Sequence, residues 1–179
     1  MRLTSLEFAQ ASPRALALAA TFSLALGGCA PATSDEEPME GELADYDAAL
    51  EAGFDPAAEY DDRIRHNAHR KNHVGAVALE NRKCLKNIAR AWAKHMAESG
   101  SFEHNPNFAK QITNQCAWKW ELVGENIAYG PSEPSIFKAW LGSAPHHANI
   151  DRKRFRYVGI GAYRKGDTLW MVANFADPM

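Results

Sequence analysis

Residues 82–100 show the clearest helical pattern in the chain. Apolar positions recur there at i, i+3, i+4 and i+7, so one helix face would be buried. These positions are Leu85, Ile88, Ala89, Trp92 and Met96. We expect Asn81 to cap this helix and Gly100 to end it. Shorter patterns predict further helices at 57–72, 108–113, 133–140 and 144–150.

Near the C-terminus the pattern changes to that of strands. Residues 157–163 and 169–175 are rich in apolar residues and flank the turn sequence Lys165-Gly166-Asp167, which predicts an antiparallel hairpin. Gly159 and Gly161 indicate that another backbone or a ligand approaches the first strand closely. Helices followed by a hairpin favour an α+β fold, with helices packed over a small antiparallel sheet.

Residues 124–130, Gly-Glu-Asn-Ile-Ala-Tyr-Gly, are the most informative stretch for function. They predict a short buried run that opens into a loop, with the carboxylate of Glu125 carried inward. Burying a carboxylate is costly unless a partner pairs with it or it becomes protonated. Histidines are the partners to expect, and the candidates are His104 and the His146-His147 pair.

Residues 1–28 are similar to a bacterial lipoprotein signal peptide. The apolar run Ala15–Leu26 is too short for a permanent membrane span but suits a signal sequence. Leu26-Gly27-Gly28-Cys29 resembles a lipobox, in which the thiol of Cys29 is lipidated before cleavage. The alternative is an ordinary signal peptide with a cysteine near the cleavage site. Because Ala30 rather than Asp follows, the resemblance favours the outer membrane in a Gram-negative host.

Residues 29–57 are predicted to be a disordered tether between lipidated Cys29 and a folded domain at 58–179. Residues 30–62 contain twelve Asp and Glu, no Lys or Arg, and three prolines. Like charges repel one another and large apolar groups are sparse, so such a segment stays extended. The remainder of the chain suffices for one compact domain and not for two.

The charge of the folded domain is opposite in sign to that of the tether. The whole chain has a net charge of −2, but residues 63–179 carry 18 Lys and Arg against nine Asp and Glu. A cationic domain suits an anionic envelope polymer or lipid as its ligand. Alternatively, the tether simply neutralises its own domain. No nucleic-acid-binding motif accompanies the charge, so we expect no nucleic acid partner; we also expect a monomer.

The three cysteines fit an exported protein. With Cys29 assigned to lipid, Cys84 and Cys116 are left as a pair in an oxidising compartment, and we expect a disulfide between them. Such a bridge would stabilise the fold by about 3–4 kcal/mol, mainly by restricting the unfolded chain. The alternative is two free buried thiols.

Several short motifs between residues 58 and 176 together resemble the CAP superfamily. Its relatives include cysteine-rich secretory proteins, plant pathogenesis-related proteins and venom allergens. The most specific motif is Gly124-Glu125-Asn126-Ile127-Ala128. The others are His66-Asn67 with Arg70, Ala91-Trp92-Ala93, Phe102-Glu103-His104, Trp140 with Ser143 and His146, Val158-Gly159-Ile160-Gly161, and Asn174-Phe175. The resemblance implies an α-β-α sandwich with a shallow cleft lined by two histidines and two acidic residues.

Three of the four cleft positions implied by the resemblance are filled here, by His104, Glu125 and His146. Animal and plant relatives place a glutamate three residues after the tryptophan, and that position is Ser143 in this chain. The tetrad of the full type is therefore absent. We expect Ser143 to cap a helix and not to act as a nucleophile, because no Gly-x-Ser-x-Gly elbow surrounds it.

Residue types leave three interpretations of the cleft open. His104 and His146 suit a Zn²⁺ ion completed by water. The same histidines and Glu125 can instead act as catalytic general base and acid around a bound water. In the third interpretation the histidines neutralise a buried Glu125 in a purely structural network.

Two other groups of residues also have more than one interpretation. His66, His69 and His73 can share one helix face; a solvent-exposed polar face is the simpler interpretation, and an adventitious metal site is the other. Near the central stretch, three aromatic residues either pack or line a groove: Trp118, Trp120 and Tyr129.

Together these features predict an exported protein, lipid-anchored to the cell envelope, that acts by ligand binding or interaction through the His/Glu cleft. One alternative is a metal-dependent hydrolase of peptides or cell-envelope polymers. A second alternative, lipid or sterol binding, rests only on relatives for which such binding has been proposed.

Overall fold

The computed structural model describes residues 40–179. The predicted signal peptide, the lipidation site Cys29 and residues 30–39 of the expected tether lie outside the described residues. Within residues 40–179, no helix has both the length and the apolar character needed to cross a membrane.

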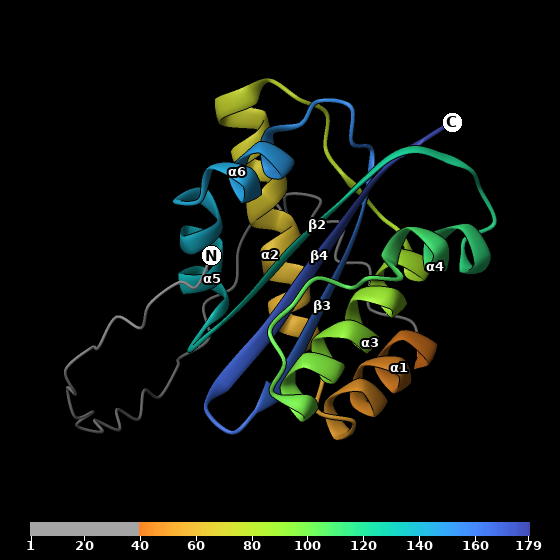
Figure 1. Ribbon diagram of the computed structural model, residues 1–179. Coiled ribbons are helices and arrows are strands. Elements are labelled where there is room, and N and C mark those ends of the chain that lie inside the picture. The colour runs from red at the N-terminus through yellow and green to blue at the C-terminus, as the bar shows by residue number, and fades with distance from the viewer. Residues whose placement is uncertain (1–39) are drawn as a thin grey trace, which may run out of the picture. The chain divides into compact units, whose positions relative to one another are not determined.

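The described residues form a four-stranded sheet covered by helices on both faces (Figure 1). The strands are β1 (Glu80–Asn81), β2 (Trp120–Gly130), β3 (Tyr157–Lys165) and β4 (Thr168–Pro178), arranged in the order β1-β3-β4-β2. The hairpin of β3 and β4 confirms the predicted one, and β2 pairs antiparallel with β4. The sheet is mixed and not purely antiparallel, because β1 pairs parallel with β3.

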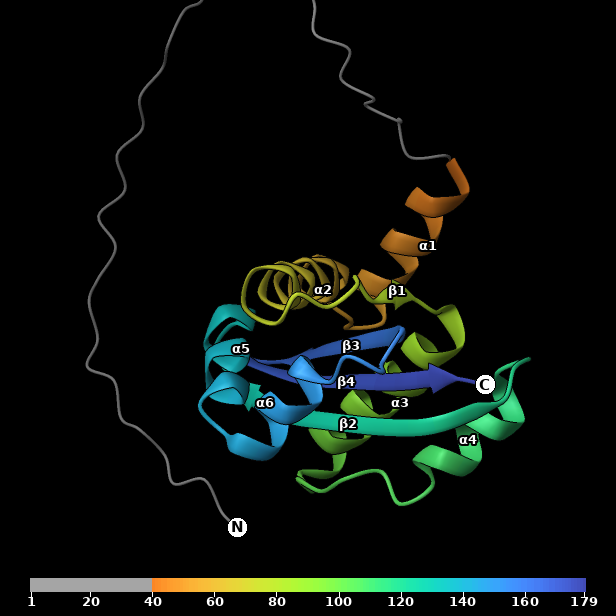
Figure 2. The ribbon, with the colours of Figure 1, turned by 90° about the horizontal axis from the view of Figure 1, so that it is seen from above.

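The helices are α1 (Glu40–Glu51), α2 (Pro56–His69), α3 (Lys83–Ser99), α4 (Phe108–Gln115), α5 (Glu133–Leu141) and α6 (Ala144–Asp151). A π-helix, η1 (Arg70–Val74), directly continues α2. Apolar residues of α2, α5 and α6 pack on one face of the sheet, and those of α3 and α4 pack on the other (Figure 2). This arrangement confirms the expected α-β-α sandwich.

Two glycines of β3 allow α3 to lie directly on the sheet. A Cβ atom on Gly159 would come within 2.1 Å of the Lys86 nitrogen, and one on Gly161 within 2.2 Å of the Arg90 nitrogen. No side chain fits in that space, so the close backbone approach predicted from the sequence is confirmed. This contact positions α3, and the loop that follows it carries His104.

Some local predictions were wrong. Asn81 lies in β1 and Arg82 occupies the N-cap position of α3. The stretch 124–130 continues β2 and does not open into a loop, because β4 pairs with it residue by residue. The region expected to be a disordered tether through residue 57 includes α1 and the first residues of α2. The domain boundary at 57/58 stays a prediction, but helical structure begins at Glu40.

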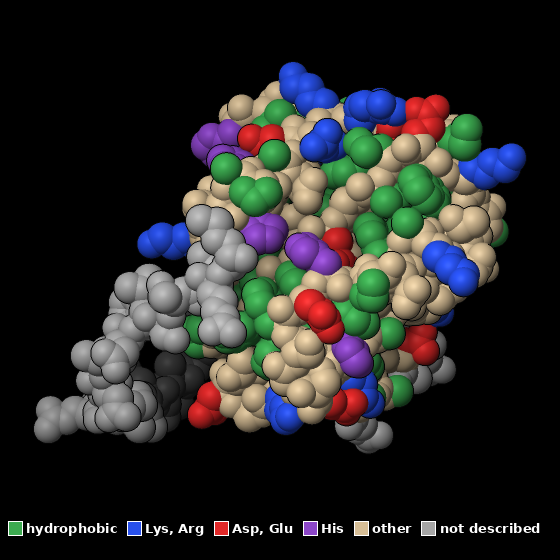
Figure 3. Space-filling view, in the orientation of Figure 1, with side chains coloured by type: hydrophobic (Ala, Val, Ile, Leu, Met, Phe, Trp, Pro, Cys, Tyr) green, Lys and Arg blue, Asp and Glu red, His purple; other side chains and the backbone are tan. Residues whose placement is uncertain are grey.

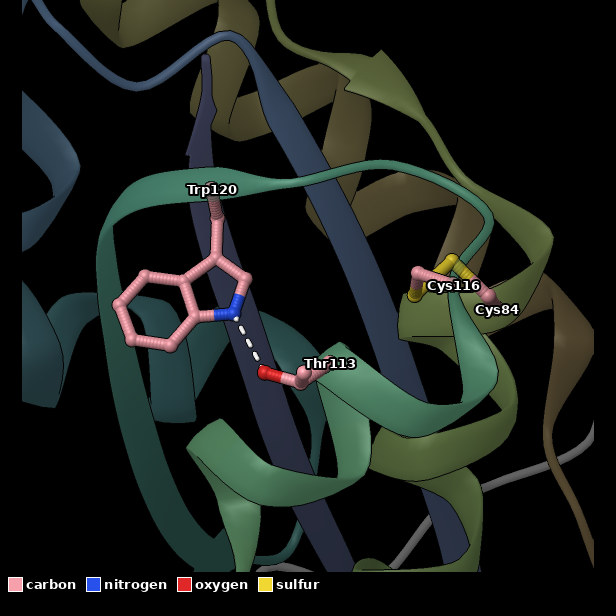
Figure 4. The surroundings of a disulfide bond; sticks show 4 residues. All are labelled: Cys84, Thr113, Cys116 and Trp120. Carbon is pink, nitrogen blue, oxygen red and sulfur yellow. Dashed lines mark hydrogen bonds between the residues drawn. A yellow bond between two sulfur atoms is a disulfide. The ribbon is translucent and has the colours of Figure 1, made fainter.

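The predicted disulfide is confirmed. Cys84 in the first turn of α3 joins Cys116 at the C-cap of α4, with a Cα–Cα distance of 5.5 Å (Figure 4). Beside it, Trp120 Nε1 donates a hydrogen bond to Thr113 Oγ1 at 3.1 Å. The bridge closes a loop that contains α3, α4 and His104, so it limits how far the His104 segment can move from the sheet.

Candidate functional site

Glu125 lies in the middle of β2, and its side chain is only 5% exposed. Its Oε1 atom accepts a hydrogen bond from the Asn105 backbone nitrogen at 3.0 Å and lies 2.8 Å from His104 Nδ1. Its Oε2 atom is buried and has no hydrogen-bond partner among the described residues. The carboxylate of Glu125 therefore points inward as expected, and one of its two oxygens, Oε2, has no hydrogen-bond partner among the described residues.

His104 is carried by the loop between α3 and α4. Gly100 ends α3 in the left-handed conformation, with φ of 73°. The Asn105 side chain then closes the loop, donating to Gln111 Oε1 at 2.8 Å and accepting from the Asn107 backbone nitrogen at 3.0 Å. The imidazole of His104 is 61% exposed, so it is open to a ligand from solvent.

His146 comes from the opposite side of β2, on α6. Its Nδ1 atom lies 2.9 Å from Ser143 Oγ. Ser143 occupies the N-cap position of α6 as expected, but its side chain makes no hydrogen bond to the helix backbone and contacts His146 instead. The prediction that Ser143 is a helix cap holds for its position and not for its hydroxyl group.

Asn126 links α6 to the strand that carries Glu125. Its Nδ2 atom donates to the His146 carbonyl oxygen at 3.0 Å, and its Oδ1 atom accepts from Asn149 Nδ2 at 2.9 Å. Successive strand side chains point to opposite faces of a sheet. Glu125 and Asn126 therefore hold the two histidine-bearing segments from either side of the edge strand. Sequence reasoning missed the role of Asn126, although Asn126 lies inside the Gly-Glu-Asn-Ile-Ala motif.

We call His104, Glu125 and His146 the central cluster. Its direct contact is between His104 and Glu125; among the described residues no hydrogen bond links His146 to either of them. Histidine side chains lie next to one another beside an acidic side chain near the middle of the face in Figure 3.

The two histidines of the central cluster differ in their electrostatics. The hydrogen bond to Glu125 raises the pKa of His104 above its ordinary value. Burial lowers the pKa of His146, and the nearby His104 lowers that pKa further. These shifts make His104 easier to protonate than His146.

A second polar cluster lies at the junction of α2 and α6. The side chains of His69, His147 and Asp151 each offer one ligand atom, and these atoms all lie within 4.8 Å of one another. In the sequence, His147 is a candidate partner for Glu125 alone, so this grouping was not predicted. Its local signal was the i, i+4 spacing of His147 and Asp151.

We expected His66, His69 and His73 to share a solvent-exposed helix face. This prediction is wrong for His66, which is fully buried. Its Nδ1 atom lies 3.1 Å from Asp62 Oδ2 and 2.9 Å from the Asp62 carbonyl oxygen. Its ring packs against Phe137, Trp140 and Phe175. His66 is thus a core residue with a buried carboxylate partner.

The aromatic residues near the central stretch divide into two groups. Trp118 packs edge-to-face on Tyr157, and Trp120 packs beside the disulfide. Tyr129 stacks on Trp170 with 4.7 Å between ring centroids and is 52% exposed. Phe102 contacts the Tyr129 ring from the edge, at 5.1 Å. Two tryptophans therefore pack, while Tyr129 belongs to an exposed aromatic group.

Residues 64–175 match the CAP family, described as the cysteine-rich secretory protein family. This chain belongs to the CAP family. The expected relationship is thereby confirmed, and the helices and mixed sheet are those of a CAP domain.

Three relatives illustrate the range of similarity to this CAP domain. The uncharacterised protein YkwD of Bacillus subtilis (strain 168) is 30% identical over 108 residues, which cover 58% of this chain and 41% of YkwD. An outer surface protein of Borrelia burgdorferi matches with a TM-score of 0.63 and 18% identity, covering 69% of this chain and 94% of that one. The crystal structure of NaASP2 with Zn²⁺ matches with a TM-score of 0.51 and 14% identity, covering 69% of this chain and 80% of that one. The CAP domain thus spans about two fifths of the length of YkwD, and the two structural matches show the fold alone.

Proposed function

We propose that this protein is an envelope-anchored CAP-domain protein that binds a ligand through the central cluster, with Zn²⁺ as part of the binding site. The observation that carries the proposal is the state of the two imidazoles. Nδ1 of His104 faces Glu125 and Nδ1 of His146 faces Ser143, at 2.8 and 2.9 Å. Among the described residues, Nε2 of neither ring has a hydrogen-bond partner.

This pattern is typical of histidines that bind metals. A metal-bound histidine nearly always uses its second ring nitrogen for a hydrogen bond to a carboxylate, a backbone carbonyl or water, and that bond fixes the tautomer. Glu125 supplies a carboxylate for His104, so in the neutral imidazole the proton is held on Nδ1 and the lone pair of Nε2 is available to a metal ion. The buried Oε2 atom of Glu125 adds an acceptor without a partner, which a ligand or bound water can satisfy.

Two imidazoles are donors that suit Zn²⁺. His104 and His146 would hold the ion through Nε2, with remaining positions open to water or ligand. The bound ion would act as a Lewis acid toward a ligand oxygen. NaASP2, which shares the fold, was crystallised with Zn²⁺, and this supports testing zinc first. Glu125 would orient His104, and Asn126 would hold the His146 segment against the strand.

The charge of the folded domain and the predicted lipid anchor both support a ligand from the cell envelope. Residues 63–179 carry an excess of positive charge, and residues 30–62 carry only negative charge. A lipid on Cys29 would hold the cationic domain near anionic envelope polymers or lipids, which such a domain attracts. The exposed pair of Phe102 and Tyr129 lies along the chain close to His104 and Glu125 and offers an apolar contact surface for that ligand.

A metal-dependent hydrolase is the main alternative. The pKa values of His104 and His146 are shifted in opposite directions, which is a pattern of acid–base pairs. No step of such a reaction is needed to explain the contacts described above, so ligand binding is the simpler function.

Lipid or sterol binding is the second alternative. A hollow of about 910 Å³ lies between α1, α2 and α3, away from the central cluster. Its lining combines apolar side chains such as Phe54 and Ile160 with charged side chains of both signs, including Lys86 and Glu59. Arg90 is paired with Glu59, so an amphipathic ligand would place an anionic head against Lys86. Saturable binding of a fatty acid by the purified protein would support this alternative.

The decisive experiment incubates the purified protein with peptidoglycan, peptides and lipid esters, with and without Zn²⁺, and measures both binding and turnover. We expect saturable, zinc-dependent binding that is lost in His104→Ala and unchanged in His95→Ala, a matched histidine on the exposed side of α3. Turnover that His104→Ala abolishes and His95→Ala does not would show that the hydrolase is the correct function. Binding that changes neither on addition of Zn²⁺ nor in His104→Ala would show that the ligand binds outside the central cluster.

A further inference from the structure

We propose that His69, His147 and Asp151 form a second site for a divalent transition metal, separate from the central cluster. The proposal does not depend on the function proposed above. It concerns another set of side chains, at the junction of α2 and α6. Two of them, His69 and Asp151, are 82 residues apart in the sequence.

The ligand atoms converge on one carboxylate. His69 Nε2 lies 2.9 Å from Asp151 Oδ1, and His147 Nε2 lies 3.3 Å from Asp151 Oδ2. The two imidazole rings meet in an edge-to-face arrangement, with their centroids 5.3 Å apart. Two imidazole nitrogens and one carboxylate oxygen within 4.8 Å of one another are a donor set that one ion can bridge.

The site is accessible without being fully exposed. His69 is 12% exposed, while His147 and Asp151 are each 39% exposed. Figure 3 shows a group of histidine side chains with an acidic side chain at the edge of the face, apart from the histidines near its middle. An ion can therefore enter from solvent and still be held by partly desolvated ligands.

A buried arginine fixes the two elements that carry the ligands. Arg70 directly follows His69, and its guanidinium donates to the carbonyl oxygens of Ile150 and Arg152 at 2.8 and 2.9 Å. These two carbonyls flank Asp151. The backbones on both sides of the site are thus held together before any ion binds, which lowers the ordering cost of binding.

Arg70 does not neutralise Asp151 by direct contact. All of its hydrogen bonds go to backbone carbonyls, namely those of Val77, Ile150, Arg152 and Phe155. Asp151 is the last residue of α6, where the helix dipole places partial negative charge and a carboxylate is unfavourable. A bound cation would relieve this repulsion.

The π-helix η1 contributes a third histidine near the site. Single π-helical turns are rare and are often found at functional sites. His73, inside η1, stacks on His69 with 4.8 Å between ring centroids. His73 is exposed and is not among the three converging ligands, so we assign it to positioning the His69 ring.

The donor chemistry selects the class of metal. Imidazole suits zinc, copper, iron and nickel, whereas Mg²⁺ and Ca²⁺ prefer sites built from oxygen ligands alone. Two histidines and one carboxylate with open positions occur in catalytic zinc sites. The proposed ion would connect α2 to α6 and so hold the helix on which His146 lies.

The test counts metal ions in variants of the purified protein without a histidine tag. Metal-free protein is titrated calorimetrically with Zn²⁺, and the titration is repeated with Co²⁺, whose absorption spectrum reports imidazole coordination. We expect two equivalents of Zn²⁺ in the wild type and in His95→Ala, but one in His147→Ala, His147→Gln and Asp151→Asn. Affinity at the lost site should fall by more than the roughly 10- to 100-fold that loss of an outer-shell partner costs.

Variants of the central cluster separate this inference from the proposed function. His104→Ala should keep the equivalent that depends on His147 and Asp151 and lose the other. A wild type that binds one ion, retained in His104→Ala and lost in His147→Gln, would support the second site and count against zinc in the central cluster. Unchanged stoichiometry and affinity in both His147→Gln and Asp151→Asn, with native circular dichroism spectra, would overturn the second site. Absence of zinc binding by the wild type would overturn it as well.

Discussion

His146 and His147 are consecutive residues of α6, and their imidazoles belong to two different polar clusters. His146 belongs to the central cluster, and its Nδ1 lies 2.9 Å from Ser143 Oγ, whereas His147 Nε2 lies 3.3 Å from Asp151 Oδ2. Adjacent residues on a helix point in directions about 100° apart, so one short helix can serve two sites. A displacement of α6 should therefore move the imidazoles of both clusters. Replacement of one of the two imidazoles should remove the contacts of its own cluster only.

Removal of the disulfide should destabilise the fold in a way that depends on oxidation. We expect Cys84→Ala to lower the free energy of unfolding by about 3–4 kcal/mol under oxidising conditions, because the unfolded chain gains the freedom of the opened loop. Urea unfolding with and without a strong reductant measures this difference. Under reductant the wild type and Cys84→Ala should be nearly equal. Equal losses in both conditions would indicate a packing role for the thiol instead of a cross-link.

The buried pair of His66 and Asp62 should make stability depend on pH. Burial alone would lower the pKa of His66, but the charge and hydrogen bonds of Asp62 outweigh it, so that the pKa lies above 6.5. Glu133 of α5 also faces His66 and favours its charged form, while Arg65 pairs with Glu133. A raised pKa in the folded state stabilises the fold below pH 6.5, and this contribution is lost as pH rises through the folded-state pKa.

We therefore expect the wild type to lose stability between pH 6.5 and alkaline pH more steeply than Asp62→Asn does. Asp62→Asn should cost about 3–5 kcal/mol at pH 6, because it leaves a buried charge without its partner, and less at high pH. Urea unfolding of both proteins across this pH range is the measurement. Glu103→Gln, a change of an exposed carboxylate, serves as control. Parallel pH profiles for the wild type and Asp62→Asn would contradict this account of the pair.

Replacement of Cys29 tests the predicted anchor. Only a thiol at this position can be acylated, so Cys29→Ser should move the protein from the membrane fraction to the soluble fraction of cells. The disulfide-linked domain should stay folded, since Cys29 lies outside it. Membrane fractionation followed by immunoblotting measures the change, with Cys84→Ser as the matched cysteine control. If Cys29→Ser sediments with membranes as the wild type does, the lipoprotein prediction is wrong.

Much of the fold could be predicted because its signals are local. The signal for each of three features comes from residues near one another in the chain: the apolar stripe from Leu85 to Met96, the hairpin turn at Gly166, and the paired glycines Gly159 and Gly161. The strand β1 could not be predicted, because its two residues carry no alternating pattern. The length of β2 was missed because Gly124 and Gly130 look like loop residues until β4 is seen to pair with them.

The candidate site was only partly predictable for the same reason. Glu125 and His104 could be matched because an isolated buried carboxylate needs a partner and the family resemblance points to the same residues. The burial of His66 was missed, although Asp62 lies four residues before it, at the spacing that brings helical side chains together. The contact between His69 and Asp151 spans 82 residues, and no local pattern predicts it.

The central claim is that His104 and Glu125 form one half of a zinc-dependent binding site. The most direct measurement is a thermodynamic cycle of His104→Ala, Glu125→Gln and the double variant, made in the His147→Ala background so that the second metal site does not contribute. Unfolding free energies are measured without metal and with Zn²⁺ at about 100 times its dissociation constant. The account predicts that the two changes are non-additive without metal, because the residues are in contact.

It also predicts that Zn²⁺ stabilises the His147→Ala background by about 2.7 kcal/mol, as expected for binding to the folded state alone. This stabilisation should vanish when His104→Ala is added. Strict additivity of His104→Ala and Glu125→Gln, together with no response of the background to Zn²⁺, would contradict the account.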